Sequence, residues 1–471
     1  MTEYSFLNEP EKPTVISKQF PGEKSAKNLQ RLDKIQDTRS VVFVQDLDGS
    51  IGNYIKDIDG NLLLDVYCQI SSIAVGYNNP RLTELAKSDK WVKAAINRPC
   101  LGVFPCEDWA ETLESAFLRV APKGLNQVFT ATCGSTSNEI AFKACFMHQQ
   151  LLKRGGSKDF TNEELTSCMV NEVPGSPNWC ILSFKSAFHG RTLGTLSTTR
   201  SKPIHKVDIP SFHWPVAPFP SLKYPLEENI QYNLEEEKRC LLEFERIIKT
   251  WETPIAAIIV EPIQGEGGDN HASPQFFTEL RRITRESNIL MIVDEVQTGV
   301  ATTGKFWAHE HWNLSTPPDF VTFSKKMQSG GVYHNLSTRA PHPYRNFNTW
   351  MGDPIRGYQA QFIVSEILDN NLTQLATTVG EYLKAELMKI SASYPDLVAN
   401  VRGQGTFMAF DSVDTATRDK IISLMRLNGL QQRVNMGGSG VKSVRLRPML
   451  IFGLKHAKIF VEALQLVCKN Y

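Results

Sequence analysis

Two ionisable side chains stand out because each follows a short apolar run. Asp294 closes the run ILMIVD, and Lys325 follows VTF and a serine, shortly before SGG. A carboxylate at the end of a buried strand is costly unless a positive or protonated group meets it, for example a protonated pyridine nitrogen. A lysine with a fixed position and a lowered pKa acts as an amine nucleophile. An aspartate that caps a turn and a solvated surface lysine are the alternatives, and these two residues alone leave both open.

A third candidate is the segment TATCGSTSNEIAFK, which places Gly134, Ser135 and Ser137 between an expected strand and an expected helix. The free backbone amides and the dipole at a helix N-terminus favour a phosphate group there. Glycine and serine before a helix more often form only a turn and an N-cap, by roughly two to one from such a segment alone. The segment is therefore a weak indication of a phosphate site.

The elements that must position these residues follow from the hydrophobic pattern. From Gln127 onward, short apolar runs alternate with amphipathic stretches, which is typical of parallel βαβ units. The clearest unit is AAIIVEP, PQFFTELRRITRE and ILMIVDEV, whose two strands end in Glu261 and Asp294. Ligands of open α/β sheets bind beyond the carboxyl ends of strands. Nearer the N-terminus, VVFVQDLDGSIGNYIKDIDGNLLLDVY predicts strands joined by Asp-Gly turns, and residues 206–237 predict a long surface or interface loop.

Composition narrows the class of protein. The 471 residues are 41% hydrophobic, and 51 basic against 50 acidic residues leave a formal charge of +1. This balance disfavours nucleic-acid and membrane-surface binding, so we expect a small-molecule partner. Nine cysteines without a CxxC pair, the absence of a secretory signal and an N-terminus without an Arg-rich presequence predict reduced thiols and a cytoplasmic location. The apolar runs fall short of the roughly 20 residues that cross a bilayer.

Six runs in one order carry a resemblance: AFHGRT, VEPIQGEGGDNHAS, DEVQTGVATTGKFWAHEHW, TFSKK, PYRNFNTW and SVRLRP. From about residue 50 to its C-terminus the chain resembles the class III aminotransferases, which depend on pyridoxal phosphate (PLP). The resemblance implies fold type I, an α/β fold with a large domain around a mostly parallel sheet and a smaller α/β domain made from N- and C-terminal segments. We expect an N-terminal extension over 1–40, the first part of the small domain and interface over 41–105, the PLP-binding domain over 106–344 and the C-terminal small domain over 345–471.

The resemblance assigns four residues to the PLP ring. Lys325 would hold the cofactor as a Schiff base and, once displaced by substrate, would move the proton between substrate and cofactor. Asp294 would pair with the pyridinium nitrogen and so keep the ring an electron sink. Gln297 would hydrogen-bond the phenolic oxygen, and Phe188 would stack on the ring. Lys326, directly adjacent to Lys325, is the formal competitor for the Schiff base.

The phosphate of PLP would lie at the weak candidate segment noted above. The resemblance assigns its binding to Gly134 and Ser135, together with Thr349 of the neighbouring subunit. It therefore implies a homodimer with shared sites. Relatives from mammals hold an iron–sulfur cluster through a second cysteine three residues after the one that matches Cys133. Here that position is Thr136, and a cluster needs about four thiolates, so we expect no cluster and no other metal.

The substrate residues also come from the resemblance. Arg191 would bind the carboxylate remote from the reacting amine through a bidentate guanidinium. Glu266 and Arg445 would pair when the substrate lacks an α-carboxylate and separate when one arrives, because an unpaired buried arginine is costly. The residues expected to line the channel are Tyr67, Ile70 and Phe347.

This pattern implies transamination of an ω-amino acid, 4-aminobutyrate (GABA), with 2-oxoglutarate to give succinate semialdehyde and glutamate. β-Alanine, which gives malonate semialdehyde, is the nearest alternative donor, and both donors are compatible with the motifs. Gly265 stands where the mammalian pattern has serine and leaves chain-length preference open. An ornithine or diamine transaminase, an aminomutase and a non-catalytic PLP-binding relative are more remote alternatives.

Overall fold

The computed structural model describes residues 3–427 and 433–471. The first two residues of the expected N-terminal extension and residues 428–432 of the expected C-terminal segment lie outside the described residues. Within the described ranges, every helix is too short or too polar to span a bilayer.

The chain forms two compact units, each assembled from separate stretches of sequence. Unit 1 comprises Met1–Ile96, Gly299–Ala308 and Phe362–Tyr471, and unit 2 comprises Asn97–Thr298 and His309–Gln361. Unit 1 thus combines N- and C-terminal segments, which the fold class predicted from the sequence requires. The four segments expected above stay a prediction.

Unit 2 is built around a seven-stranded sheet with the order β4-β10-β9-β8-β7-β5-β6. Only β10 runs antiparallel to its neighbours, so the predicted mostly parallel sheet is confirmed. Strands β7 and β8 are buried along their whole length, and their continuous Ile, Val and Leu runs are typical of strands covered on both faces. The strands are β4 (Gln127–Ala131), β5 (Cys180–Phe184), β6 (Val216–Ala217), β7 (Ile255–Val260), β8 (Leu290–Asp294), β9 (Phe320–Phe323) and β10 (Gly330–His334).

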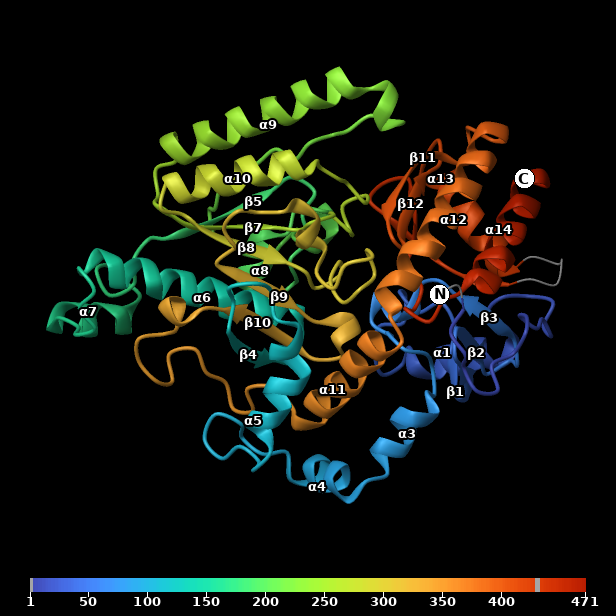
Figure 1. Cartoon of the computed structure of the whole chain (residues 1–471), viewed down its shortest axis with the longest axis horizontal. Helices are drawn as coiled ribbons and strands as arrows, with labels where there is room; N and C mark the ends of the chain where they lie inside the picture. The colour runs from blue at the N-terminus through green and yellow to red at the C-terminus, as the bar shows by residue number, and fades with distance from the viewer. Residues whose placement is uncertain (1–2, 428–432) are drawn as a thin grey trace. The chain divides into compact units, whose positions relative to one another are not determined.

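Helices cover both faces of this sheet. In Figure 1, α9 and α10 are layered against one side, and α6 runs along the other, where it contacts β7 to β10. Ser273 caps α10 by accepting the amide hydrogen of Phe276. The principal helices are α6 (Gly134–Lys153), α8 (Leu193–Thr198), α9 (Ile230–Thr250), α10 (Pro274–Glu286) and the first part of α11 (Pro354–Asp369). The shorter helices of this unit are α5 (Trp109–Thr112) and α7 (Asn162–Ser167).

The loop predicted over residues 206–237 is only partly correct, because α9 already begins at Ile230. Its first turns are polar in sequence, but Asn233 exchanges hydrogen bonds with the backbone of Lys223, and buried Glu237 accepts from Ser273. Polar side chains thus hold the first turns of α9 to residues outside the helix. The start of α9 therefore lacks the apolar repeat by which a helix is predicted from sequence.

The described residues of unit 1 form two four-stranded sheets and three long helices. The first sheet has the order β1-β2-β3-β13, and the second has the order β11-β12-β15-β14. The predicted strands are present, and Asp59-Gly60 lies in the turn between β2 and β3 as predicted. The other predicted Asp-Gly turn is wrong, because Asp48 and Gly49 lie inside β1, and residues 41–44 precede that strand. The N-terminal strands are β1 (Gln45–Ile51), β2 (Tyr54–Asp57) and β3 (Leu62–Asp65). The C-terminal strands are β11 (Ala399–Gln404), β12 (Phe407–Asp411), β13 (Val434–Asn435), β14 (Gly437–Ser439) and β15 (Ser443–Leu446). The helices are α1 (Glu23–Leu32), α2 (Cys68–Ser71), α3 (Pro80–Ala86), α4 (Asp89–Asn97, at the unit boundary), α12 (Leu372–Ser393), α13 (Thr415–Leu427) and α14 (Leu454–Lys469).

The N-terminal extension is tied to unit 1 by a buried carboxylate. Glu9 accepts hydrogen bonds from the backbone and side-chain nitrogens of Asn53, pairs with Lys455 at 2.9 Å and lies 3.1 Å from His456. Burial alone would raise the pKa of Glu9, but His456, Asn53 and Lys455 lower it to about 2. The extension therefore contributes to the packing of unit 1.

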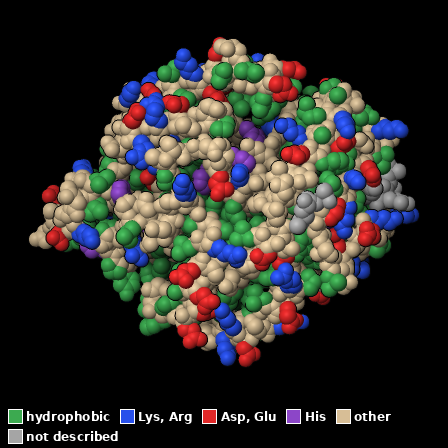
Figure 2. Space-filling model, viewed as in Figure 1, with side chains coloured by type: hydrophobic (Ala, Val, Ile, Leu, Met, Phe, Trp, Pro, Cys, Tyr) green, Lys and Arg blue, Asp and Glu red, His purple; other side chains and the backbone are tan. Residues whose placement is uncertain are grey.

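The visible surface agrees with the near-zero net charge. In Figure 2, acidic and basic side chains are mixed on the visible face of each unit and do not gather into one patch. This distribution gives no support on that face to binding of a polyanion.

Candidate functional site

Asp294 ends strand β8 with its carboxylate buried, as the sequence predicted for a strand-end acid. Its Oδ2 accepts from Asn138 Nδ2 at 2.9 Å and lies 2.8 Å from His189 Nδ1, while Oδ1 accepts from the Val296 amide at 3.0 Å. A carboxylate offers about four lone-pair positions, so these three contacts leave room for one more donor. The protonated ring nitrogen of PLP has the charge and hydrogen that such a position needs.

The two side chains that hold Asp294 escaped the sequence reasoning. Asn138 lies on α6, donates to the backbone oxygen of His189 as well as to Asp294, and accepts from Thr322 at 2.7 Å. His189 is buried next to Phe188 in AFHGRT. The motif AFHGRT could have pointed to His189, because this polar residue directly follows Phe188, which is assigned to ring stacking. Asn138, within an ordinary helical run, gave no comparable signal.

Lys325 directly follows β9 and one linking serine, at the start of a short 3-10 turn ending at Met327. Its φ is +30°, outside the common regions for a residue with a side chain, and its carbonyl accepts from the Gln328 amide at 2.7 Å. Lys325 is partly exposed, whereas Lys326 is only 1% exposed. Because an amine that binds a cofactor must be reachable, this difference favours Lys325 over its neighbour.

The N-terminus of α6 offers backbone amides at a close approach. The helix is 20 residues long, and its first amides have no partner within the helix. A Cβ on Gly134 would come within 2.6 Å of Val296, and a Cβ on Gly190 would come within 2.4 Å of Ser135 Oγ. A side chain at either glycine would push these neighbouring loops apart. Gly134 and Ser135 lie at the start of α6, the position that the sequence suggested for a phosphate.

Thr136 takes part in the same helix start. Its Oγ1 accepts from the Cys133 amide at 3.1 Å and donates to the Cys133 carbonyl at 2.8 Å. The residue that replaces the second cysteine of the mammalian pattern therefore closes a capping interaction.

Phe188 and Arg191 lie in the loop between β5 and α8, with the guanidinium carbon 5.0 Å from the ring centroid. Arg191 Nη2 lies 3.3 Å from His205 Nε2. Burial lowers the pKa of His205, and the charge of Arg191 lowers it further, so the neutral imidazole accepts from the guanidinium. Arg191 itself is exposed and keeps donors available for a carboxylate.

Gln297 and Glu266 meet in unit 2. Gln297 Nε2 donates to Glu266 Oε1 at 3.4 Å, and a Cβ on Gly265 would come within 2.6 Å of the Gln297 amide. A serine at position 265 would therefore displace Gln297. Gly265, which departs from the mammalian pattern, thus leaves the space that the Gln297 side chain occupies.

Glu261, the strand-end acid of β7, has a different role from Asp294. Its two oxygens accept from the amides of Phe188 at 2.8 Å and Gly265 at 3.1 Å. Burial, then the charge of Asp294, raises its pKa well above the usual range. The sequence suggested a ligand position here, but Glu261 instead fixes the two loops that present Phe188 and Glu266.

Tyr67, Ile70 and Arg445 belong to unit 1. Arg445 lies in β15, 4% exposed, with its guanidinium carbon 5.4 Å from the centroid of the Tyr67 ring. A Cβ on Gly437 would come within 2.4 Å of that ring. The Tyr67 ring thus packs against the paired strands β14 and β15 at Gly437 and Arg445. Ile70 is 47% exposed.

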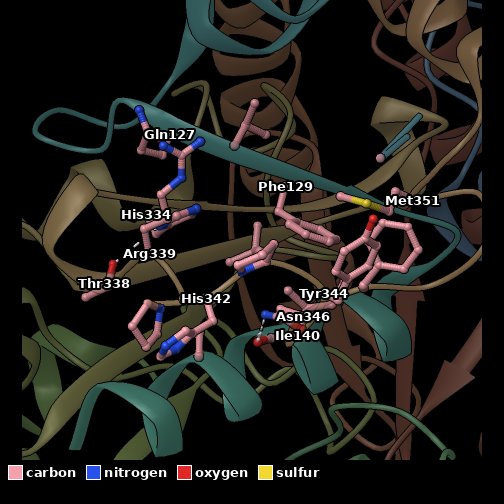
Figure 3. A pocket seen from close by; sticks show the side chains of 18 of the residues that line it. Gln127, Phe129, Ile140, His334, Thr338, Arg339, His342, Tyr344, Asn346 and Met351 are labelled. Carbon is pink, nitrogen blue, oxygen red and sulfur yellow. Dashed lines mark hydrogen bonds between the residues drawn. The ribbon is translucent and has the colours of Figure 1, made fainter. Parts of the chain in front are cut away.

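Phe347 and Thr349 lie on the irregular segment before α11. Phe347 lines a cavity of about 530 Å³ whose other lining residues include Gln127, Phe129 and His334 but none of the residues assigned to substrate or cofactor. Figure 3 shows Tyr344 and Met351 on the same side of that cavity. Thr349 is exposed, and its carbonyl accepts from Cys100 Sγ. Within one chain, this segment is therefore held to residues 100–102 and β4.

The residues of unit 2 fit PLP. Asp294 has a lone-pair position left for a ring N–H, Lys325 is reachable after β9, and the α6 N-terminus provides amides for the phosphate. Phe188 is half-buried beside His189, so an aromatic face is available next to the Asp294 cluster. These features agree in charge and hydrogen bonding with the parts of the cofactor assigned to them.

The chain matches a protein family over most of its length. The family described as aminotransferase class III covers residues 35–468.

Named relatives are similar over almost the whole chain. A 4-aminobutyrate aminotransferase from Dictyostelium discoideum is 58% identical over 96% of this chain and 90% of its own length. The mitochondrial 4-aminobutyrate aminotransferase of Sus scrofa is 48% identical, covering 95% of this chain and 89% of the relative. Among solved structures, a lysine aminotransferase from M. tuberculosis superposes with a TM-score of 0.82 at 29% identity, covering 94% of this chain and 98% of that chain.

Proposed function

The chain belongs to the class III aminotransferases, and we propose that it transfers the amino group of GABA to 2-oxoglutarate, producing succinate semialdehyde and glutamate. The cofactor of this family is PLP. The observation that carries the donor assignment is the pair Arg191 and His205, beside the Phe188 ring. This pair presents a guanidinium for a carboxylate that lies remote from the amine. The 58% identity to a named 4-aminobutyrate aminotransferase supports the same donor.

PLP, when bound, withdraws the electrons left behind when the carbon next to the substrate nitrogen loses its proton. Lys325, on a fixed turn directly after β9, would accept and return that proton. Asp294, held by Asn138 and His189, would keep the ring nitrogen protonated. Gln297 would donate toward the phenolic oxygen.

Arg191 and Arg445 divide the recognition of carboxylates between them. Arg191 binds the distal carboxylate that GABA and 2-oxoglutarate share. Arg445 binds the α-carboxylate that only 2-oxoglutarate and glutamate carry. Glu266 would neutralise Arg445 during the GABA half of the cycle, since a buried unpaired arginine is costly. This pairing is proposed from the family resemblance.

We also propose a homodimer in which Thr349 and Phe347 serve the neighbouring subunit's site. Support comes from their placement: Phe347 lines a cavity that contains none of the other assigned residues, and Thr349 is exposed. Mixing a Thr349→Ala chain with a Lys325→Ala chain tests this assignment, because hybrid dimers regain one intact site only if the sites are shared. Equal activity of the mixture and of the separate variants contradicts it.

The donor assignment is tested by single-turnover reaction of the PLP enzyme with GABA, β-alanine and ornithine, followed by the loss of cofactor absorbance. We expect GABA to react fastest and β-alanine, one methylene shorter, to react within about 10–200-fold of it. Ornithine should react slowest, because it offers no distal carboxylate at the distance set by Arg191. Preference for ornithine would overturn the proposal and favour a diamine transaminase instead.

The location of the protein is proposed as cytoplasmic, as the sequence predicts. The relative from Sus scrofa carries the word mitochondrial in its name. Cell fractionation followed by detection of the chain tests the assignment, and its recovery with mitochondria would reverse it.

A further inference from the structure

The segment that carries Tyr67 and Ile70 has an unusual backbone. Cys68, Gln69, Ile70 and Ser71 all have positive φ, between +50° and +66°. Consecutive left-handed residues are disfavoured for L-amino acids because Cβ approaches the following carbonyl oxygen, and a β-branched residue such as Ile70 suffers most. No glycine relieves this turn. A strained conformation of this kind persists only when its surroundings determine it, and it is typical of functional sites.

Asp65 holds the start of this turn. Its Oδ1 accepts from the backbone amides of Tyr67 at 2.9 Å and Cys68 at 3.0 Å. Its Oδ2 accepts from Tyr77 Oη at 2.7 Å, and Asn435 Nδ2 donates to Oδ1 at 2.9 Å. The carboxylate is fully buried, with three of these bonds on Oδ1 and one on Oδ2. All four donors belong to the protein, so Asp65 acts on the chain around it.

The same carboxylate links the turn to the strands that carry the predicted α-carboxylate arginine. Asn435 lies two residues before Gly437, which pairs with Arg445 across β14 and β15. The Val66 amide donates to the Asn435 carbonyl at 2.9 Å, and the Val66 carbonyl accepts from the Arg447 amide at 2.7 Å. Hydrogen bonds to both the amide and the carbonyl of Val66 therefore fix the backbone directly before Tyr67.

We propose that Asp65 is a positioning residue that holds the preformed left-handed turn of residues 68–71 directly after Tyr67, and that this turn determines which ω-amino acid length the enzyme accepts. The proposal rests on the proposed function above, in which Tyr67 and Ile70 line the substrate channel. A rigid surface distinguishes substrates that differ by one methylene, whereas a surface that relaxes accepts both. Removing Asp65 leaves two buried amides without their acceptor and frees the turn to return to right-handed backbone.

The test compares Asp65→Ala with Asp65→Asn, using the PLP enzyme. The readouts are kcat/KM for GABA and for β-alanine, and the dissociation constant of PLP measured by absorbance. In Asp65→Ala, we expect the ratio of the two kcat/KM values to change at least about tenfold, mainly through KM. We expect PLP affinity to stay within about threefold of wild type, because the cofactor residues lie in unit 2. Asp65→Asn should keep the wild-type ratio, since the amide oxygen retains the three bonds of Oδ1.

A second variant keeps the proposal testable if Asp65→Ala fails to fold. Ile70→Gly preserves a left-handed backbone without steric cost and removes the side chain, so the donor ratio should change as in Asp65→Ala while thermal stability is retained. Ile35→Gly is the matched control, because Ile35 is 82% exposed and lies outside the turn. The control should leave the donor ratio unchanged.

The outcomes separate the two proposals. If the wild type reacts with neither GABA nor β-alanine, the proposed function fails. If the wild type reacts with both but folded Asp65→Ala and Ile70→Gly keep its donor ratio, only the role of the turn is overturned. An equal loss of PLP affinity and of kcat for both donors in Asp65→Ala, without rescue by Asp65→Asn, would also overturn it, since it would show a merely structural role.

Discussion

Strand β8 in unit 2 and strand β3 in unit 1 each end in a buried aspartate, and the hydrogen-bond donors around the two carboxylates differ. Asp294 at the end of β8 is contacted by Asn138, His189 and the Val296 amide, which leaves one lone-pair position. Asp65 at the end of β3 accepts four hydrogen bonds, two of them from the turn that it begins. The residue type and its place in the strand are the same. What differs is the source of the donors. Two distant side chains, Asn138 and His189, hold Asp294, whereas two backbone amides of the adjoining turn bind Asp65 and tie it to the local fold.

The largest effect should come from Lys325. Lys325→Ala removes the amine that moves the proton, so kcat should fall by about 10⁴-fold, the upper end for general acid–base catalysis. Steady-state assay with GABA and 2-oxoglutarate measures this loss. Lys326→Ala is the matched control, and it should lose less activity because Lys326 is buried beside the turn. A greater loss in the control would exchange the roles of the two lysines.

A smaller loss should follow from Asp294→Asn, which breaks the comparison between the two aspartates directly. The amide keeps the shape but not the charge that holds the ring nitrogen protonated, so we expect kcat to fall by about 10²–10³-fold. Asp65→Asn serves as its partner and should stay near wild type. Equal losses in the two variants would show that both aspartates act through charge, contrary to the account.

Arg191→Lys should act on substrate binding and leave the cofactor unchanged. A lysine keeps the charge but loses the bidentate geometry, so the KM for GABA should rise by about 10–100-fold with PLP absorbance unaltered. Initial rates over a range of GABA concentrations measure the change. An unaltered KM would remove Arg191 from the substrate site.

The smallest effect should come from Glu9, a buried carboxylate whose partners Asn53, Lys455 and His456 are assigned to neither substrate nor cofactor. Its pKa is lowered to about 2 from 4.5, so its contribution to stability is complete above about pH 5 and is lost as the pH falls toward 2. Glu9→Gln should lower the free energy of unfolding at pH 7 by about 1–3 kcal/mol and flatten the acid limb of the stability curve. Urea unfolding from pH 3 to pH 7 shows whether the variant and the wild type converge at low pH, as expected. A constant difference would mean that Glu9 does not contribute through its charge.

Much of unit 2 could be predicted because its signals are local. Strands β7 and β8 are apolar runs, and the sequence already identified the acid that follows β7, Glu261, and the acid that ends β8, Asp294. The contacts that hold Asp294 could not be predicted in this way. Asn138 lies 156 residues away from it in sequence, and no hydrophobic period marks such a pair.

The left-handed turn of unit 1 illustrates the opposite case. The run VYCQISS contains no glycine and includes isoleucine, so local preference argues against positive φ. The conformation comes from Asp65, Tyr77 and Asn435, of which the last lies 370 residues from Asp65. Tertiary contacts override the local preference here, and only the structure reveals them.

The most direct measurement for the central claim is identification of the lysine that carries the cofactor. Borohydride reduction of the PLP enzyme, proteolysis and mass spectrometry locate the residue that gains the cofactor's mass. We expect the modification to lie on Lys325 and to be absent when GABA is added before the reductant. Modification of Lys326, or no modification on either lysine, would contradict it.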